Sequence, residues 1–319
     1  MGRQPNIYDF ATSAVMCSLF LIAGCAQTPT LALKFPPKDS TTYKVTTQSE
    51  MSLKFEGPML NKNEFKDSRS QNTIEMTFTQ QVLNTDDKGN AVVEVTIKEL
   101  KCLSIYRDKI TLDFDSAREK DRDDPLGKLV GQSYTIEMTP SGRVSKVIDA
   151  NDARDAVSGN KAAALLSGDV IKERHTITAL PATDKEKLRI GDNWSSVKIF
   201  PFPIIGSRAY ERIYTLKQIK AIKGRKYAII EMNAIPSAEM AKQLHTEQET
   251  SSFSKLFDNT ETYTGELKLD LTAGKVEKYF EELQSEWVIL DPSAVLKDDE
   301  EANSVKMGAI RSYCIEKID

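Results

Sequence analysis

Histidine is almost absent from this chain of 319 residues, which has only two, and no catalytic signature surrounds either of them. His175 and His245 lack the HExxH spacing, or a nearby glutamate, that a metal-dependent hydrolase needs. The chain also lacks the GxSxG, GxxxxGKS/T and GxGxxG patterns of hydrolase elbows and phosphate-binding loops. We therefore predict a protein that is not an enzyme, with no metal, no cofactor and no catalytic residue. The alternative is a site built from distant residues, such as His175 with acidic side chains.

Neither sign of charge dominates. The chain has 43 basic and 47 acidic residues, a formal net charge of −4, and the two signs are interspersed. Nucleic-acid-binding domains concentrate basic residues on one face, so this balance argues against a nucleic-acid partner. The acidic stretch 113–124 offers carboxylates for calcium, but it lacks EF-hand spacing and Arg118, Lys120 and Arg122 interrupt it. A solvated loop is the favoured interpretation of this stretch.

Long apolar runs are also missing, except for residues 11–24. This run of 14 residues is shorter than the roughly 20 residues of a membrane-spanning helix, and it suits the apolar region of a secretory signal. It ends in Ile22-Ala23-Gly24-Cys25, where small residues would let a peptidase reach the backbone between Gly24 and Cys25. A plain signal peptide with an incidental cysteine, or an uncleaved core segment, is the alternative.

The sequence around Cys25 resembles the lipobox of bacterial lipoproteins. The resemblance implies that Cys25 carries a thioether-linked diacylglycerol and that another acyl chain joins the new amino terminus. Two or more chains give stable anchoring, whereas one gives only marginal binding. Ala26, in place of an aspartate, is similar to an outer-membrane sorting signal. We therefore expect a membrane partner through the lipid and a location in the cell envelope, at the outer membrane, facing the periplasm or the surface.

Two further cysteines follow the predicted cleavage site. Cys102 and Cys314 could form a disulfide in an oxidising compartment, and neither belongs to a CxxC motif. Two separate buried thiols are the alternative.

Period-two alternation dominates the rest of the chain. From Thr41 to Phe55 the odd positions are mostly apolar and the even positions polar, which predicts a long strand with one dry face. Similar stretches flank the turns at 86–90, 140–142, 223–226 and 272–274, which predicts hairpins. The final residues, 308–319, are expected to return to the sheet as a last strand.

Only one segment favours a helix. Residues 150–167 are rich in alanine, with Asp149 or Asn151 as the expected N-cap. We expect the charged stretch 113–131 to be a loop followed by a short helical turn.

These elements predict a mainly β protein with long antiparallel strands and one or two short helices. With few helices to cover a core, the sheet must curve into a half-barrel or pack as a sandwich. Similar hairpins in the two halves suggest a duplicated unit. The predicted domains are a signal peptide (1–24), a lipidated cysteine and tether (25–38), a first β-rich unit ending in a helix (39–168), and a second β-rich unit (169–319).

The mature chain is similar to a family of uncharacterised bacterial lipoproteins with a domain of unknown function. The motifs that carry the resemblance are Leu31-Ala32-Leu33-Lys34-Phe35 with Asp39, Asp115-Ser116, Gly142-Arg143-Val144, and Gly191-Asp192 with Trp194. Lys38 replaces the glycine of the family's opening motif. The resemblance implies a location and a β-rich fold, and no activity.

More distantly, a curved sheet on a lipoprotein resembles LolA-type lipid carriers, in which a concave apolar face holds acyl chains. That resemblance implies a hydrophobic ligand face with the 150–167 helix as a lid, formed by Leu53, Phe55, Ile74, Met76, Phe78, Val93, Val95, Tyr134, Ile136 and Met138. An ordinary closed core is the alternative for these residues.

Two functional hypotheses follow. In the first, the protein is an anchored, non-enzymatic envelope protein that binds a protein or an envelope polymer through its β-surface. In the second, it carries or senses a hydrophobic ligand, such as a lipid or an acyl chain, in a concave sheet.

Overall fold

The computed structural model describes residues 30–56, 67–158, 161–182, 188–202, 206–237, 257–290 and 304–318. The predicted signal peptide and the lipidation site, with Gly24 and Cys25, lie outside the described residues. Within the described ranges, no helix is long and apolar enough to cross a bilayer. Leu31 and Leu33 are buried, so the chain already packs against the body at the start of the described part.

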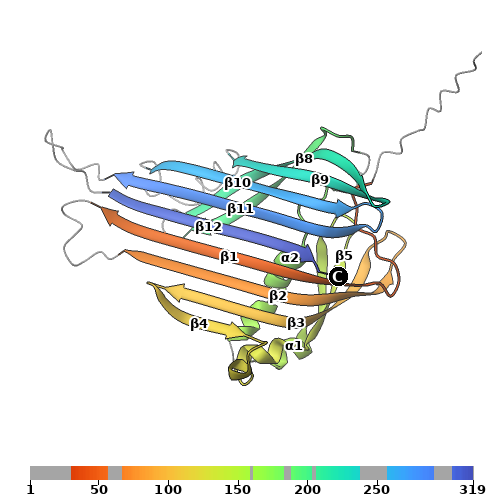
Figure 1. Ribbon diagram of the computed structural model, residues 1–319, viewed down its shortest axis with the longest axis horizontal. Helices are drawn as coiled ribbons and strands as arrows, with labels where there is room; N and C mark the ends of the chain where they lie inside the picture. Colours follow the sequence, from red (N-terminus) through yellow and green to blue (C-terminus); the bar gives the residue numbers. More distant parts are fainter. Residues whose placement is uncertain are drawn as a thin grey trace, which may run out of the picture.

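Twelve antiparallel strands form one open sheet, which confirms the predicted mainly β class (Figure 1). The strands are β1 (Ser40–Glu56), β2 (Ser68–Thr85), β3 (Ala91–Tyr106), β4 (Lys109–Asp115), β5 (Ser133–Met138), β6 (Val144–Asp149), β7 (Asn193–Phe202), β8 (Gly206–Ile222), β9 (Arg225–Pro236), β10 (Phe257–Asp270), β11 (Lys275–Leu290) and β12 (Ser304–Lys317). Their order is β6-β5-β3-β2-β1-β12-β11-β10-β9-β8-β7, with β4 paired to β3. The first and last strands therefore lie side by side in the middle of the sheet.

Alternation along each strand decides which face is buried. In β1, Thr41, Tyr43 and Val45 are buried and the residues between them only partly so. Met76 and Phe78 of β2 lie on the same face, which we call the inner face. The hairpins β2–β3, β5–β6, β8–β9 and β10–β11 and the last strand β12 form as predicted. Strand β4 was not predicted.

The sheet curls so that β7 and β8 fold over its inner face. Two strands separate β8 from β11, which in a flat sheet would place them roughly 14 Å apart. Yet Arg212 of β8 lies 3.1 Å from Glu281 of β11. The rings of Phe202 in β7 and Trp287 in β11 have centroids 4.9 Å apart. The curl creates an enclosed interior between distant parts of one sheet.

The predicted helix over 150–167 is wrong as a single element. The structure has α1 (Asn151–Asp155), a 3-10 turn (Lys161–Leu166) and α2 (Gly168–His175). Ser167 caps α2, its Oγ accepting from the backbone N–H of Val170. The N-cap of α1 is Ala150, which offers no side-chain acceptor, and Asp149 instead accepts from the backbone N–H of Asn151. Helices α1 and α2 lie behind the long strands in Figure 1.

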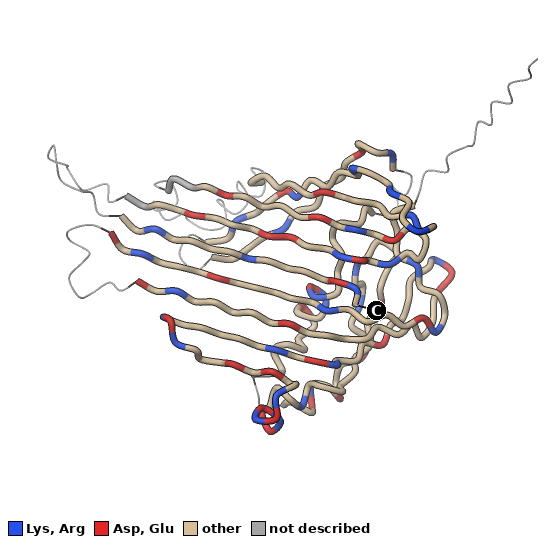
Figure 2. The backbone as a smooth tube through the Cα atoms, in the orientation of Figure 1, with Lys and Arg blue, Asp and Glu red and all other residues tan. Residues whose placement is uncertain are grey.

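Strands from the two predicted units belong to the same sheet, joined where β1 pairs with β12. The division into units at residue 168 stays a prediction. Figure 2 shows Lys and Arg interspersed with Asp and Glu along the long strands.

Candidate functional site

The inner face forms a cavity of about 700 Å³, partly open to solvent, between α2 and the curled sheet. Strands β1, β2 and β12 contribute to one side, α2 and the preceding 3-10 turn to another, and β7, β8, β10 and β11 to the rest. Small-molecule sites commonly have volumes of roughly 300–1,000 Å³. The cavity is therefore large enough for a ligand with a medium-length acyl chain.

Apolar residues from five elements line much of this cavity. They are Val45, Ile74, Met76, Leu165, Val170, Val197, Ile199 and Phe200. Val45 and Met76 are buried, while Val197 and Ile199 of the edge strand β7 are exposed. The apolar residues of the wall thus extend from the interior to the exposed edge of the sheet.

A buried ion pair lies in the wall of the cavity. Arg212 and Glu281 line it, and Nη1 of Arg212 donates to Oε2 of Glu281 at 3.1 Å. Their side chains are only 3% and 10% exposed. The hydroxyl of Tyr279 also donates to Oε2 of Glu281, at 2.8 Å. Burial, and then the charge of Glu281, raise the pKa of Tyr279 well above its ordinary value. The phenol therefore stays protonated and acts as a donor.

Thr178 links this pair to the segment after α2. Its Oγ1 lies 3.0 Å from Nη1 of Arg212, 3.3 Å from the hydroxyl of Tyr214 and 3.0 Å from that of Tyr279. With Arg212 and Tyr214 as donors, Thr178 is left to donate to Tyr279. The network therefore joins strands β8 and β11 to the segment beyond α2, and it fixes the polar wall.

A second buried network surrounds the end of α2. Nε2 of His175 lies 2.6 Å from the hydroxyl of Tyr134, and Nδ1 lies 3.3 Å from Nε2 of Gln80. Nη1 of Arg174 donates to the same Tyr134 hydroxyl at 3.4 Å. Burial, and then the charge of Arg174, lower the pKa of His175 well below its ordinary value. His175 is thus neutral, and its hydrogen-bond partners in the described structure are Tyr134 and Gln80 rather than a carboxylate.

Arg311 of β12 occupies a different part of the cavity wall. Its Nη2 donates to the carbonyl of Pro201 at 3.2 Å, and its guanidinium lies 5.9 Å and 5.5 Å from the ring centroids of Phe200 and Phe202. Nearby, Lys198 forms an ion pair with Glu173 at 2.5 Å. The cavity wall therefore combines apolar side chains with cationic groups.

The ten residues predicted as a hydrophobic ligand face do not all meet in this cavity. Ile74 and Met76 line it. Val93 and Met138 line a second, much smaller pocket of about 30 Å³, room for about one water. The others lie elsewhere: Phe78, Val95, Tyr134 and Ile136 are fully buried in the packed core, and Leu53 and Phe55 are half-buried towards the end of β1.

Sequence reasoning missed the charged residues of the cavity, among them Arg174, Arg212, Glu281 and Arg311. A signal existed for at least two of them, because Glu281 in β11 alternates with the buried Tyr279 and Leu283. In β8, Arg212 alternates with Tyr210, Tyr214 and Leu216, so it occupies an inner-face position in an otherwise apolar series. A charged residue at such a position needs a buried partner, which here is Glu281.

Cys102 and Cys314 are free thiols. Strands β2 and β1 lie between their strands β3 and β12, which separates them by roughly 14 Å. A disulfide needs Cα atoms less than about 7 Å apart, so the alternative of two separate thiols holds.

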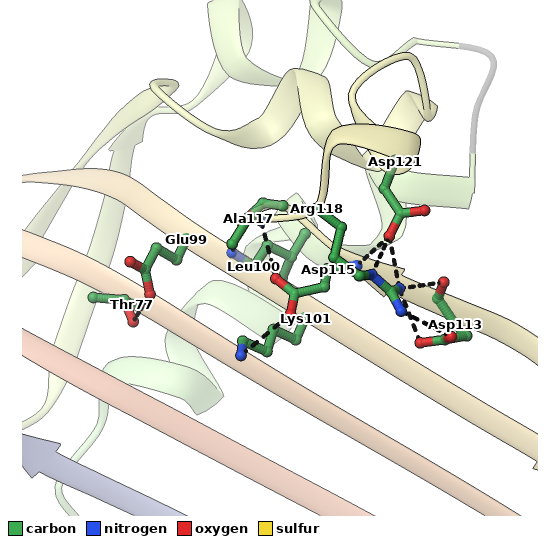
Figure 3. Close-up of polar contacts among 10 residues, drawn as sticks. Thr77, Glu99, Leu100, Lys101, Asp113, Asp115, Ala117, Arg118 and Asp121 are labelled. Atoms are coloured by element: carbon green, nitrogen blue, oxygen red, sulfur yellow. Dashed lines mark hydrogen bonds and ion pairs between the residues drawn. The ribbon is translucent and has the colours of Figure 1, made fainter.

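In the acidic stretch 113–124, the carboxylates of Asp113 and Asp121 bond Arg118 (Figure 3). Arg118 bonds both carboxylate oxygens of Asp113 at 2.9 Å and, through Nε, Oδ2 of Asp121 at 2.7 Å. Asp115 accepts from the backbone N–H of Ala117 and pairs with Lys101. No cluster of three or more metal-ligating side chains occurs among the described residues.

No family model matches the chain, and no curated protein matches it. One solved structure, described as "Lipid-protein interactions in lipovitellin", is similar over 90% of this chain and 26% of that chain, with 8% sequence identity and a TM-score of 0.42. The chain thus spans about a quarter of that protein's length. A similarity at this level carries no argument about function.

Proposed function

We propose that this protein is a lipid-anchored protein of the bacterial cell envelope that carries or senses a ligand with an apolar chain. The inner-face cavity of about 700 Å³ carries the proposal. Packed protein interiors leave few voids larger than a water molecule, and these are small. A cavity of this size with buried Val45 and Met76 in its wall is better explained as a binding site than as a packing defect.

The chemistry of the wall favours a ligand with one apolar and one polar part. Apolar residues of β1, β2, α2 and β7 line the cavity, and the buried pair of Arg212 and Glu281 is fixed in the same wall. Ligand sites typically combine such an apolar wall with a few placed polar groups. Neither carboxylate nor imidazole groups are arranged here as an acid–base pair, and we propose a binding role rather than catalysis.

The expected anchor is compatible with this role. If Cys25 carries the lipid, five peptide links join it to Thr30, the first described residue, and span at most roughly 18 Å. The cavity-bearing domain would then stay close to the membrane, where lipids are available. Binding of an envelope protein or polymer through the outer face of the sheet stays a prediction.

Photocrosslinking in cells tests the proposal. Bacteria that produce the full chain are supplied with a fatty acid carrying a diazirine and an alkyne, and are then irradiated. The crosslinked peptides of the purified chain are mapped by mass spectrometry. We expect light-dependent crosslinks to the cavity wall, near Ile74–Met76 on β2 and Val170 on α2. If these peptides carry no light-dependent crosslink, the proposed function is wrong.

Two neighbouring substitutions provide a matched control. Thr47 lines the cavity, whereas Thr46 points to the opposite face of the same strand. Thr47→Trp should fill part of the cavity and reduce the crosslinks severalfold. Thr46→Trp should leave them unchanged. An equal effect of both variants would point to loss of folding or expression rather than to the cavity.

A further inference from the structure

Three arginines from three different elements line the cavity. Arg174 comes from α2, Arg212 from β8 and Arg311 from β12. Arg174 and Arg212 are 7% and 2% exposed, so their guanidinium groups are held inside the protein. Burying a charge is costly unless a counter-charge and hydrogen bonds compensate it. The hydrogen-bond and ion-pair partners of each arginine therefore indicate which ligand charge the cavity can accept.

Only one of these arginines has a carboxylate partner in the described structure. Arg212 pairs with Glu281, but its Nε is buried without any hydrogen-bond acceptor. Arg174 donates to the carbonyl of Leu165 at 2.8 Å and to the hydroxyl of Tyr134, both of them uncharged.

Arg311 is half-buried and has the fewest acceptors of the three among the described residues. It donates to one carbonyl, that of Pro201, and otherwise lies over aromatic rings. Burial lowers the pKa of its guanidinium, and the charge of Glu173 acts in the opposite direction. The guanidinium nevertheless remains cationic, because an arginine side chain is always protonated in proteins.

The remaining charged residues of the cavity wall do not neutralise the positive charge of the three arginines. The lining side chains with a charge are Lys172, Glu173, Arg174, Lys198, Arg212, Glu281 and Arg311. Five are cationic and two are carboxylates, and both carboxylates are already in ion pairs. The described wall therefore has a net charge of +3 (five minus two), in a protein whose overall charge is −4.

We propose that the ligand of this cavity is an anionic amphiphile, whose carboxylate or phosphate head group lies against the arginines while its acyl chain follows the apolar wall. This inference rests on the proposed function and names its ligand class. Arg311 is the residue that we expect to bind the head group, because a guanidinium can hold a carboxylate or a phosphate through two parallel N–H donors. The orphan Nε of Arg212 offers a further buried donor.

Competition between amphiphiles of equal chain length tests the head group. The full chain, kept in a neutral detergent, is mixed with equimolar dodecanoate, dodecyl phosphate, dodecanol and dodecyltrimethylammonium. Bound species are resolved by native mass spectrometry. We expect at least one anionic ligand to bind roughly tenfold better than dodecanol, as one charge-assisted hydrogen bond would give. A higher signal for dodecanoate or for dodecyl phosphate then identifies the head group.

The outcomes separate this inference from the proposed function. If all four ligands bind equally, or the cation binds best, the anionic head group is wrong and the cavity still binds apolar chains. If none binds, both proposals are wrong. This comparison needs only the native sequence, so it does not depend on a variant that folds.

Arg311→Gln should remove most of the preference for the anions and leave the binding of dodecanol unchanged. Arg69→Gln is the matched control, since Arg69 pairs with Glu50 outside the cavity and is largely exposed. A preference that persists in Arg311→Gln, with dodecanol still bound, would overturn the role of Arg311.

Discussion

The guanidinium of Arg212 lies 3.1 Å from the carboxylate of Glu281, although two strands separate their positions in the sheet. This contact joins β8 to β11 across the interior and holds the curl of the sheet. The same pair lines the cavity. One buried ion pair therefore connects the shape of the fold with its candidate site.

Glu281→Gln should destabilise the protein strongly. The substitution leaves Arg212 buried without a counter-charge, which typically costs about 3–5 kcal/mol. Urea unfolding followed by circular dichroism measures the change. The control is Glu231→Gln, which removes an exposed pair with Lys217 and should cost about 1 kcal/mol or less. Equal losses in the two variants would contradict the structural role of the buried pair.

Stability should fall as the pH drops from about 6.5 to 5, because of His175. Its pKa in the folded state lies well below its ordinary value, owing to burial and to the charge of Arg174. In this window the unfolded chain binds a proton that the folded chain does not, so the free energy of unfolding decreases by up to about 1.4 kcal/mol per pH unit.

His175→Asn isolates this effect, because asparagine does not titrate. Urea unfolding at each pH gives the free energy of unfolding of the native protein and of the variant. The difference between the two pH profiles should show the loss of stability that His175 causes as the pH falls. His245 is present in both proteins and cancels in the comparison. Parallel profiles over pH 5–6.5 would show that His175 is not held neutral by the fold.

Local patterns in the sequence predict most of the strands. In β1 the apolar Tyr43 and Val45 alternate with the charged Lys44. Successive side chains in a strand point to opposite faces, so this pattern predicts a strand with one buried face. Turn residues likewise predict the hairpins, as at Lys223 and Gly224, where both residues have positive φ. The helix boundary was wrong because Ser158-Gly159-Asn160 has low helix propensity and Ser167 starts a new helix.

The cavity depends on contacts that local patterns do not contain. Ile74 and Phe78 lie on the same face of β2, so the alternation does not distinguish them. Ile74 faces the cavity and Phe78 the packed core because different parts of the chain pack over them. The pairing of β1 with β12 joins residues 248 to 274 positions apart in the chain. The inward Arg212 in β8 and Glu281 in β11 marked the interior as polar, but their pairing depends on the curl.

Cys102 and Cys314 should both react with an alkylating reagent after unfolding without any reductant, because they are free thiols on separate strands. In the folded protein, Cys102 should react slowly, since burial raises its pKa to about 11. Differential alkylation with two isotopic forms of iodoacetamide, followed by peptide mapping, measures both properties. A Cys102–Cys314 disulfide peptide would contradict the separation of their strands.

Gly265→Ala should destabilise the sheet next to the buried pair. Gly265 lies opposite Glu281, and an added Cβ would meet the carbonyl oxygen of Phe280 at 2.5 Å and Cα of Glu281 at 3.2 Å. Such overpacking against backbone typically costs about 1–3 kcal/mol. Gly168→Ala is the control, because nothing lies within 4 Å of its added Cβ. Thermal unfolding should show a lower midpoint for the first variant only; an unchanged midpoint in Gly265→Ala would mean that the strands can separate there.

Lipidation of Cys25 is the prediction that links the cavity to a membrane. Cells grown with an alkyne-bearing fatty acid should yield a labelled native chain in the membrane fraction and an unlabelled Cys25→Ala variant. Cys314→Ala is the matched control and should be labelled like the native chain, since Cys314 lies in a strand of the folded body. If the native chain carries no label, the lipobox interpretation is wrong. A plain signal peptide or an uncleaved segment would then be the remaining interpretation of residues 11–25. The cavity and its arginines would then have to serve a ligand that the protein meets in solution.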